Sequence, residues 1–202
     1  MPSLIPSWAP NLHPLVIHFP IALWSTAALI VALRALSQGT LARNADRVLA
    51  PILFLGGVLG ALGLVSGLLV WPLEAVASSP LARNHLLLAS WALAYWLLLA
   101  LVRWVGGEQV WQGLWRWTML GLAGLGMGLQ TITGTLGGYL AGNPSAVSEV
   151  LRRLGWEVFT TFYLPDWVLI VLSIATVALI ALGAAGRRTT APAKGGMVHE
   201  AV

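Results

Sequence analysis

Five long apolar stretches set the pattern of this chain, and the short segments between them carry most of its charged residues. A bilayer core of about 30 Å requires roughly 20 helical residues per crossing, and each stretch is of about that length. The pattern predicts five transmembrane helices, near residues 14–36, 48–73, 82–105, 115–140 and 167–182.

The segment before the last stretch is different, because it alternates apolar and charged residues. Asn143 and Pro144 are typical of a helix cap and first turn, and Glu149, Arg152 and Arg153 share a polar side. The apolar residues that follow the helical period are Val147, Val150, Leu151, Leu154 and Val158. We expect a short amphipathic helix on the outer membrane surface.

The predicted fold is therefore an all-α membrane protein, a bundle of five transmembrane helices with a short amphipathic surface helix before the fifth. We divide it into a four-helix membrane domain (1–142), the surface helix with its loop (143–164), the fifth transmembrane helix (165–186) and a disordered cytoplasmic tail (187–202). The first residues lack the basic region of a secretory signal, so we expect the first helix to be retained.

Composition narrows the function classes. With 58% hydrophobic and 9% charged residues, the chain has too little polar surface for a soluble protein. It has no cysteine, which excludes disulfides, thiolate metal sites and c-type haem attachment. The eleven basic residues behind its net charge of +4 are scattered, so nucleic acid is not an expected partner. No nucleotide-binding or hydrolase motif occurs.

The distribution of basic residues predicts the orientation, because cytoplasmic loops are enriched in lysine and arginine. One predicted side carries Arg34, Arg43, Arg47, Arg103, Arg116, Arg187, Arg188 and Lys194, and the other carries Arg83, Arg152 and Arg153. We expect a multi-pass protein of the bacterial inner membrane with its N-terminus outside and its C-terminus in the cytoplasm.

Histidines supply the candidate chemistry, since ionisable side chains inside membrane spans are rare and expensive. His18 and His85 are expected at similar depths in the first and third spans, where two imidazoles could ligate a b-type haem from both faces. His13 directly precedes Pro14, and we expect it at a helix cap or the membrane interface, with a second role as the alternate ligand. An ordinary interfacial position is an equally good explanation for His85.

Other polar residues have two explanations each. Arg83, Arg152 and Arg153 could bind haem propionates, although single loop arginines more often bind lipid phosphates or water. The polar half of the fourth span could line a quinone cavity, or could bond to its own and neighbouring helices; it contains Gln130, Thr131, Thr133 and Thr135.

The string Leu12-His13-Pro14-Leu15-Val16-Ile17-His18-Phe19-Pro20-Ile21-Ala22-Leu23 resembles the opening motif of the domain of unknown function 2231 family. His85 and the string Thr133-Gly134-Thr135-Leu136-Gly137-Gly138 stand where that family has a later histidine and a TGxLGG-like string. The resemblance covers residues 12–142 and leaves the fifth span unassigned. Some relatives look as though they accompany cytochrome-like modules, which implies a redox role.

Three functions remain at this point. We favour a membrane electron-transfer subunit that carries b-type haem. It would relay electrons between an external redox partner, such as a periplasmic cytochrome, and quinone or another membrane subunit. The alternative is a cofactor-free structural subunit of a larger membrane complex. A transporter of small solutes or ions is disfavoured, because no carboxylate lies deep in any predicted span and a proton-coupled carrier would usually have one.

Overall fold

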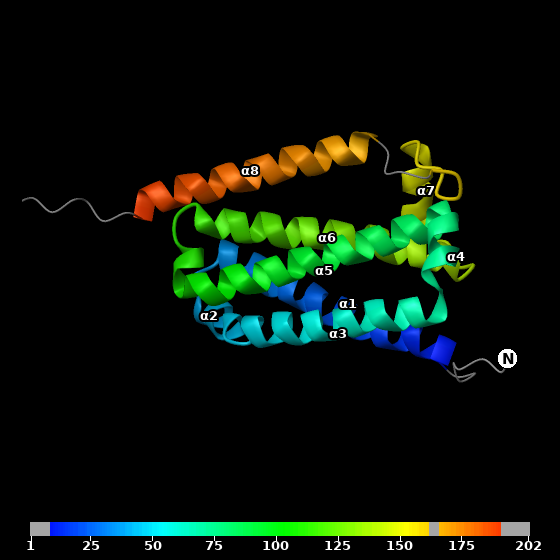
Figure 1. Ribbon diagram of the computed structural model, residues 1–202. Helices are drawn as coiled ribbons and strands as arrows, with labels where there is room; N and C mark the ends of the chain where they lie inside the picture. Colours follow the sequence, from blue (N-terminus) through cyan, green and yellow to red (C-terminus); the bar gives the residue numbers. More distant parts are fainter. Residues whose placement is uncertain (1–8, 162–165, 191–202) are drawn as a thin grey trace, which may run out of the picture.

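The computed structural model describes residues 9–161 and 166–190, and within these residues it contains helices and no strand. Five long helices lie along one another in Figure 1: α1 (Ala9–Leu36), α3 (Leu49–Val70), α5 (Pro80–Gly106), α6 (Trp115–Leu140) and α8 (Asp166–Thr190). Short helices cover the two ends. At one end lie α2 (Thr40–Asp46) and the 3₁₀ helix η1 (Gly107–Trp111), and at the other lie α4 (Leu73–Ser78) and α7 (Ala146–Arg153).

Four helical segments of the described chain are long and apolar enough to cross a membrane, which indicates a membrane protein. They are Leu12–Leu36, Thr40–Val70, Pro80–Trp111 and Asp166–Gly186. The predicted fourth span forms α6 with the predicted boundaries, but α6 is not among the four. Its glycines, threonines and Gln130 interrupt its apolar residues, so it has no stretch as apolar as those of the four.

The first helix corrects the predicted start of the first span. It begins at Ala9, so Pro14 lies inside the helix together with Pro20 instead of at its first turn. His13 is consequently a helical residue and not a cap. At the other end of the chain, α8 continues to Thr190, so residues 187–190 are helical where a disordered tail was expected. Residues 191–202 of that tail lie outside the described residues.

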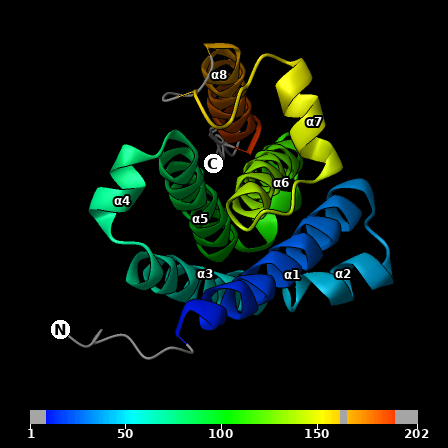
Figure 2. The same cartoon turned by 90° about the vertical axis from the view of Figure 1, so that its right-hand side faces the viewer.

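The predicted surface helix is present but short. It forms α7 and ends at Arg153, before the predicted apolar position Val158. Figure 2 shows α7 lying across the end of the bundle beside α6. Its residues Ser148 and Leu151 are buried. On its exposed side Glu149 forms ion pairs with Arg152 and Arg153. The helix therefore has the amphipathic character that the sequence predicts.

Helices α1, α3, α5 and α6 form a four-helix bundle (Figure 2). In this bundle α1 packs against α3 and α6, and α5 packs against the same two helices, so that α1 and α5 lie diagonally opposite. The last long helix, α8, packs on the outside against α6.

The hairpins α1–α3 and α5–α6 repeat the same pattern of contacts. His13 and Trp24 stand eleven positions apart on α1, and His85 and Trp96 stand eleven positions apart on α5. In each hairpin the next long helix supplies three small residues, the first against the tryptophan and the other two against the histidine. They follow one another at the same steps of seven and four positions, as Gly56, Gly63 and Gly67 in α3 and as Gly126, Thr133 and Gly137 in α6. The two hairpins therefore place one histidine and one tryptophan each in equivalent positions.

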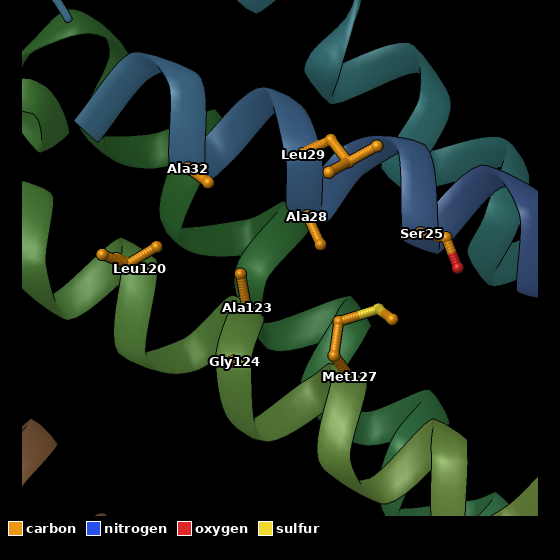
Figure 3. Close-up of a pocket in the computed structure, with 8 residues that line it drawn as sticks. All are labelled: Ser25, Ala28, Leu29, Ala32, Leu120, Ala123, Gly124 and Met127. Carbon is orange, nitrogen blue, oxygen red and sulfur yellow. The ribbon is translucent and has the colours of Figure 1, made fainter. Parts of the chain in front are cut away.

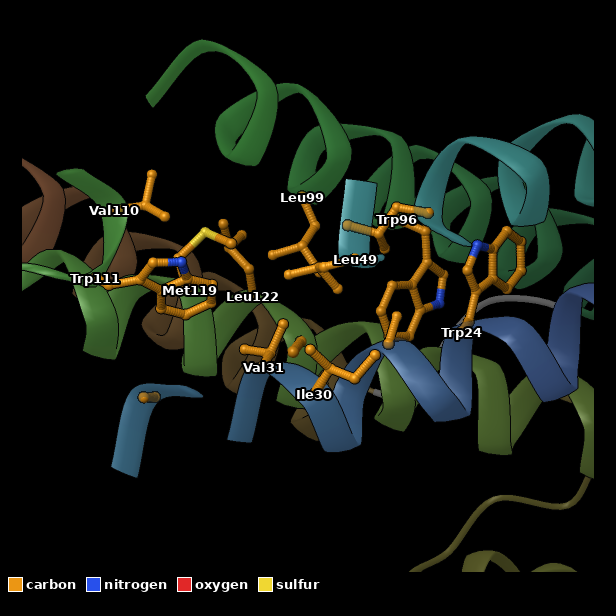
Figure 4. Close-up of a cluster of buried hydrophobic side chains, with 14 residues drawn as sticks. Trp24, Ile30, Val31, Leu49, Trp96, Leu99, Val110, Trp111, Met119 and Leu122 are labelled. Carbon is orange, nitrogen blue, oxygen red and sulfur yellow. The ribbon is translucent and has the colours of Figure 1, made fainter. Parts of the chain in front are cut away.

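The two tryptophans meet in the middle of the bundle (Figure 4). Their ring centroids are 5.7 Å apart and their planes differ by 9°, which makes Trp24 and Trp96 a stacked pair. Trp24 reaches this position because a Cβ atom at Gly56 would lie 2.5 Å from its Nε1 atom. Glycine at this position lets a large aromatic ring approach the neighbouring backbone. The stack is the centre of the hydrophobic core, and the histidines lie beyond it toward the end that carries α4 and α7.

Candidate functional site

The imidazole of His13 is held by α3. Its Nδ1 atom lies 3.0 Å from the carbonyl oxygen of Gly63 and 3.1 Å from the hydroxyl of Ser66. That hydroxyl itself donates to the same carbonyl. A carbonyl oxygen only accepts, so Nδ1 carries the proton of the neutral ring and Nε2 keeps its lone pair. The ring lies on Gly67, where a Cβ atom would come 3.0 Å from Cε1 of the histidine.

The imidazole of His85 is held by α6 in the same manner. Its Nδ1 atom lies 3.0 Å from the carbonyl oxygen of Thr133. The ring lies on Gly137, whose added Cβ would be 3.0 Å from Cε1 of His85. Carbonyl and glycine are four positions apart in both cases, one helical turn. His85 therefore has the same tautomer as His13, with its Nε2 lone pair available.

These two imidazoles occupy equivalent positions in the two hairpins. Both are partly buried and both come from the end of the bundle that carries α4 and α7. Histidines that ligate metals commonly donate Nδ1–H to a backbone carbonyl, which fixes the ring and leaves Nε2 to the metal. The structure therefore gives His13 and His85, the alternate pair of the sequence analysis, the same anchoring in their two hairpins.

The first-span ligand favoured by the sequence analysis, His18, has a different environment. It is exposed, and its Nδ1 atom contacts the carbonyl of Pro14 in its own helix. A step of five residues from His13 turns about 140° around a helix, which takes His18 away from the face that meets α3.

The candidate propionate ligands Arg152 and Arg153 are already paired with a carboxylate. Glu149 accepts bonds of 3.0 and 2.8 Å from Arg152 and of 3.1 Å from Arg153. These bonds lower the pKa of Glu149 to about 2 and raise the pKa of Arg152, so the pairs persist at neutral pH. Arg83 lies on α5 two positions before His85 and is partly buried. It is the candidate arginine nearest to an imidazole in the chain.

The polar residues of α6 mostly bond to protein. Gln130 donates to the Ser25 hydroxyl at 3.2 Å and to the carbonyl of Ile21 at 3.3 Å, which ties α6 to α1. Thr133 donates to the carbonyl of Leu129 in its own helix at 2.7 Å. These bonds favour the second explanation of the sequence analysis, in which the polar half of α6 holds helices together.

A buried ionic cluster at the opposite end of the bundle was not anticipated. Asp46, 2% exposed, accepts two bonds from Arg103, at 3.0 and 2.7 Å, and one from the indole of Trp111 at 3.1 Å. Glu108 extends the cluster to Arg103 and to the buried Arg34. The cluster fastens α2 and η1 to the ends of α1 and α5. The sequence placed these residues at span ends but gave no sign of their pairing.

The donor set of the histidine pair fits haem better than a bare metal ion. Structural zinc requires four protein ligands. The described residues contain no group of three or more histidine, cysteine, aspartate or glutamate side chains that could hold a metal ion. A haem supplies four nitrogen ligands of its own and requires only two axial side chains. His13 and His85 supply that number of imidazoles, each anchored through Nδ1.

A comparison of the chain with protein-family models, with curated proteins and with solved structures gives no match in any of the three. The resemblance to the domain of unknown function 2231 family accordingly stays a prediction.

Proposed function

We propose that this protein is a membrane-embedded electron-transfer subunit that binds b-type haem through His13 and His85. The observation that carries the proposal is the matched anchoring of the two imidazoles, by the Gly63 carbonyl in one hairpin and the Thr133 carbonyl in the other. The electron partners would be an external redox protein, such as a periplasmic cytochrome, and either quinone or another membrane subunit.

Each part of the site has a defined task under this proposal. The two carbonyls keep Nδ1 protonated and fix the ring orientations, and Gly67 and Gly137 leave room for the rings. The surrounding apolar helices keep water away and favour the neutral imidazole that ligation requires. Haem, when bound, supplies a one-electron carrier. Arg83 is the candidate partner for a propionate, and Arg152 and Arg153 would have to leave Glu149 to take part.

Purification with an absorption spectrum tests the proposal. Protein extracted in mild detergent, alone or with copurifying subunits, should show a reduced-minus-oxidised difference spectrum of b-type haem, and its pyridine extract should contain non-covalently bound haem. A pure, folded protein from haem-replete cells with no pigment and no haem in the extract would refute this function.

We further propose that α6 is a fifth transmembrane span and that the N-terminus is outside. A helix packed among α1, α5 and α8 is covered largely by protein, so it tolerates glycine and polar residues. The end that carries α2 and η1 contains Arg34, Arg43 and Arg103, as the positive-inside rule requires of the cytoplasmic side.

A reporter enzyme tests this orientation. Alkaline phosphatase folds only outside the cytoplasm, so a fusion after residue 202 should be inactive, whereas a fusion in the loop between α6 and α7 should be active. The second fusion is the matched control for expression. Activity of the C-terminal fusion would reverse the orientation.

A structural subunit is the second candidate, and open glycines favour it. A Cβ atom added at Gly124, Gly128 or Gly134 of α6 would meet no atom within 4 Å. A groove of about 390 Å³ between α1 and α6, lined largely by small and apolar side chains, includes Gly124 (Figure 3). Neighbouring transmembrane helices pack on such surfaces. A colourless protein that copurifies with other membrane subunits would support this candidate against the haem proposal.

A further inference from the structure

A second hollow of the bundle has more polar side chains in its wall than the groove of Figure 3, where Ser25 is the one residue with a hydroxyl among those that line it. It lies between α8 and the pair α5–α6, with a volume of about 480 Å³. Leucines and other apolar side chains form most of its wall, and three hydroxyl groups interrupt this wall: Tyr95 of α5, Thr118 of α6 and Thr176 of α8. Ligand sites usually have this character, a mainly apolar cavity with a few placed polar groups.

The hydroxyl of Thr118 carries the argument. The residue is 5% exposed, and its Oγ1 atom has no hydrogen-bond partner among the described residues. Hydroxyls in membrane helices are usually satisfied by the carbonyl four residues earlier. Thr26 and Thr133 of this chain make that bond, at 2.9 and 2.7 Å. Thr118 is instead a buried residue of the cavity wall whose hydroxyl has no hydrogen-bond partner among the described residues.

The other two hydroxyls form a weak pair. The Tyr95 and Thr176 oxygens are 3.4 Å apart, which is long for a bond between hydroxyls. Either can turn its proton toward a ligand without losing a strong bond. Tyr95 lies near the middle of α5 and Thr176 near the middle of α8, where a surrounding bilayer offers only hydrocarbon.

Two contacts, one toward each end of the cavity, hold α8 against the bundle, and between them Leu179 packs on Gly121 of α6. The first is the Tyr95–Thr176 pair. The second is at the other end, where Gly186 lies on the indole of Trp115, so closely that a Cβ atom would come 2.8 Å from Cδ1 of the ring. Between these contacts α8 presents the small residues Gly183 and Ala184 to the cavity. The helix therefore bridges the space without filling it.

We propose that this cavity binds the head group of an isoprenoid quinone. A quinone is a flat apolar ring with carbonyl oxygens on opposite edges, and these accept hydrogen bonds from hydroxyl groups. No lysine, arginine, aspartate or glutamate lines the cavity, which argues against a charged ligand. The acyl chains of a phospholipid would offer no hydrogen-bond acceptor to the Tyr95 and Thr176 hydroxyls near the middle of α5 and α8. Electron exchange between a quinone in this cavity and haem rests on the proposed function. Binding of the quinone head group to the cavity does not depend on haem.

Photolabelling of the full-length purified protein tests the site. An azido-quinone with a short isoprenoid tail should label peptides of α5, α6 and α8, and unlabelled quinone should abolish the labelling. Thr118→Val keeps the shape of the side chain and removes its hydroxyl, and it should weaken quinone binding about fivefold to tenfold. Thr26→Val is the matched control, because that hydroxyl bonds only within α1, and it should bind as the unmodified protein does.

The outcomes separate this site from the haem site. Quinone binding should persist in a His85→Ala variant, so loss of pigment there does not affect the inference. Labelling that does not saturate, equal affinity in Thr118→Val and the unmodified protein, or displacement of the probe by phospholipid without quinone would each overturn the quinone site. A missing haem spectrum with intact quinone binding would refute only the proposed function.

Discussion

Replacing Asp46 by alanine is expected to lower the free energy of unfolding by about 3–5 kcal/mol, the usual loss when one partner of a buried ion pair is removed. The carboxylate is 2% exposed and accepts from both Arg103 nitrogens that face it and from the Trp111 indole. Its loss leaves a largely buried guanidinium without its main partner. The end of the bundle formed by α2 and η1 should loosen first.

Unfolding of the detergent-purified protein, followed by circular dichroism against temperature or denaturant, measures this effect. Glu149→Ala is the matched control, because Glu149 also bonds two arginines but lies on the exposed side of α7. Exposed ion pairs contribute little to stability, so the control should unfold close to the unmodified protein. Equal losses in the two variants would show that burial of the Asp46 cluster is not what stabilises this end.

Substituting His13 or His85 by alanine should abolish the b-type haem spectrum, and each substitution should have the same effect. The reason is the equivalence of the two hairpins, each of which supplies one imidazole anchored by a carbonyl on the next helix. A haem with one axial protein ligand missing is lost or becomes high-spin, with a large change in its absorption bands. The measurement is the difference spectrum at matched protein concentration.

His18→Ala is the control for that series, since His18 lies on the exposed side of α1 and contacts only its own helix among the described hydrogen bonds. It should keep the spectrum. His85→Met offers a further test of the ligand at this position. Because methionine also ligates haem iron, this variant should keep haem and raise its reduction potential. If His18→Ala lost haem and His13→Ala kept an unchanged spectrum, the first-span ligand would be His18 and not His13.

Helical structure and most span boundaries could be predicted from the apolar pattern, and the beginning of α1 could not. Proline at a first turn is common, and that rule placed the start of the helix at Pro14. Transmembrane helices also tolerate proline in their interior, where neighbouring groups satisfy the freed carbonyls. The sequence alone does not distinguish the two cases, and the structure continues the helix back to Ala9.

The candidate site was predicted in part for the same reason. A helix starting at Pro14 makes His13 a cap, so His18 became the favoured partner of His85. The eleven-residue step from each histidine to a tryptophan was present in the sequence and would have matched His13 with His85. The Asp46–Arg103 pair had no comparable signal, because its members are 57 positions apart and only the packing of α2 on the bundle brings them together.

The repeated hairpin also has an evolutionary consequence. Duplication and fusion of a gene for one helical hairpin would account for both halves, and in that ancestor two copies would have met as a symmetric dimer. A single histidine codon would then have supplied both imidazoles, and one mutation would have changed both. On that origin the histidine pair would predate the joined chain, and single-hairpin proteins that pair as dimers would be its surviving trace.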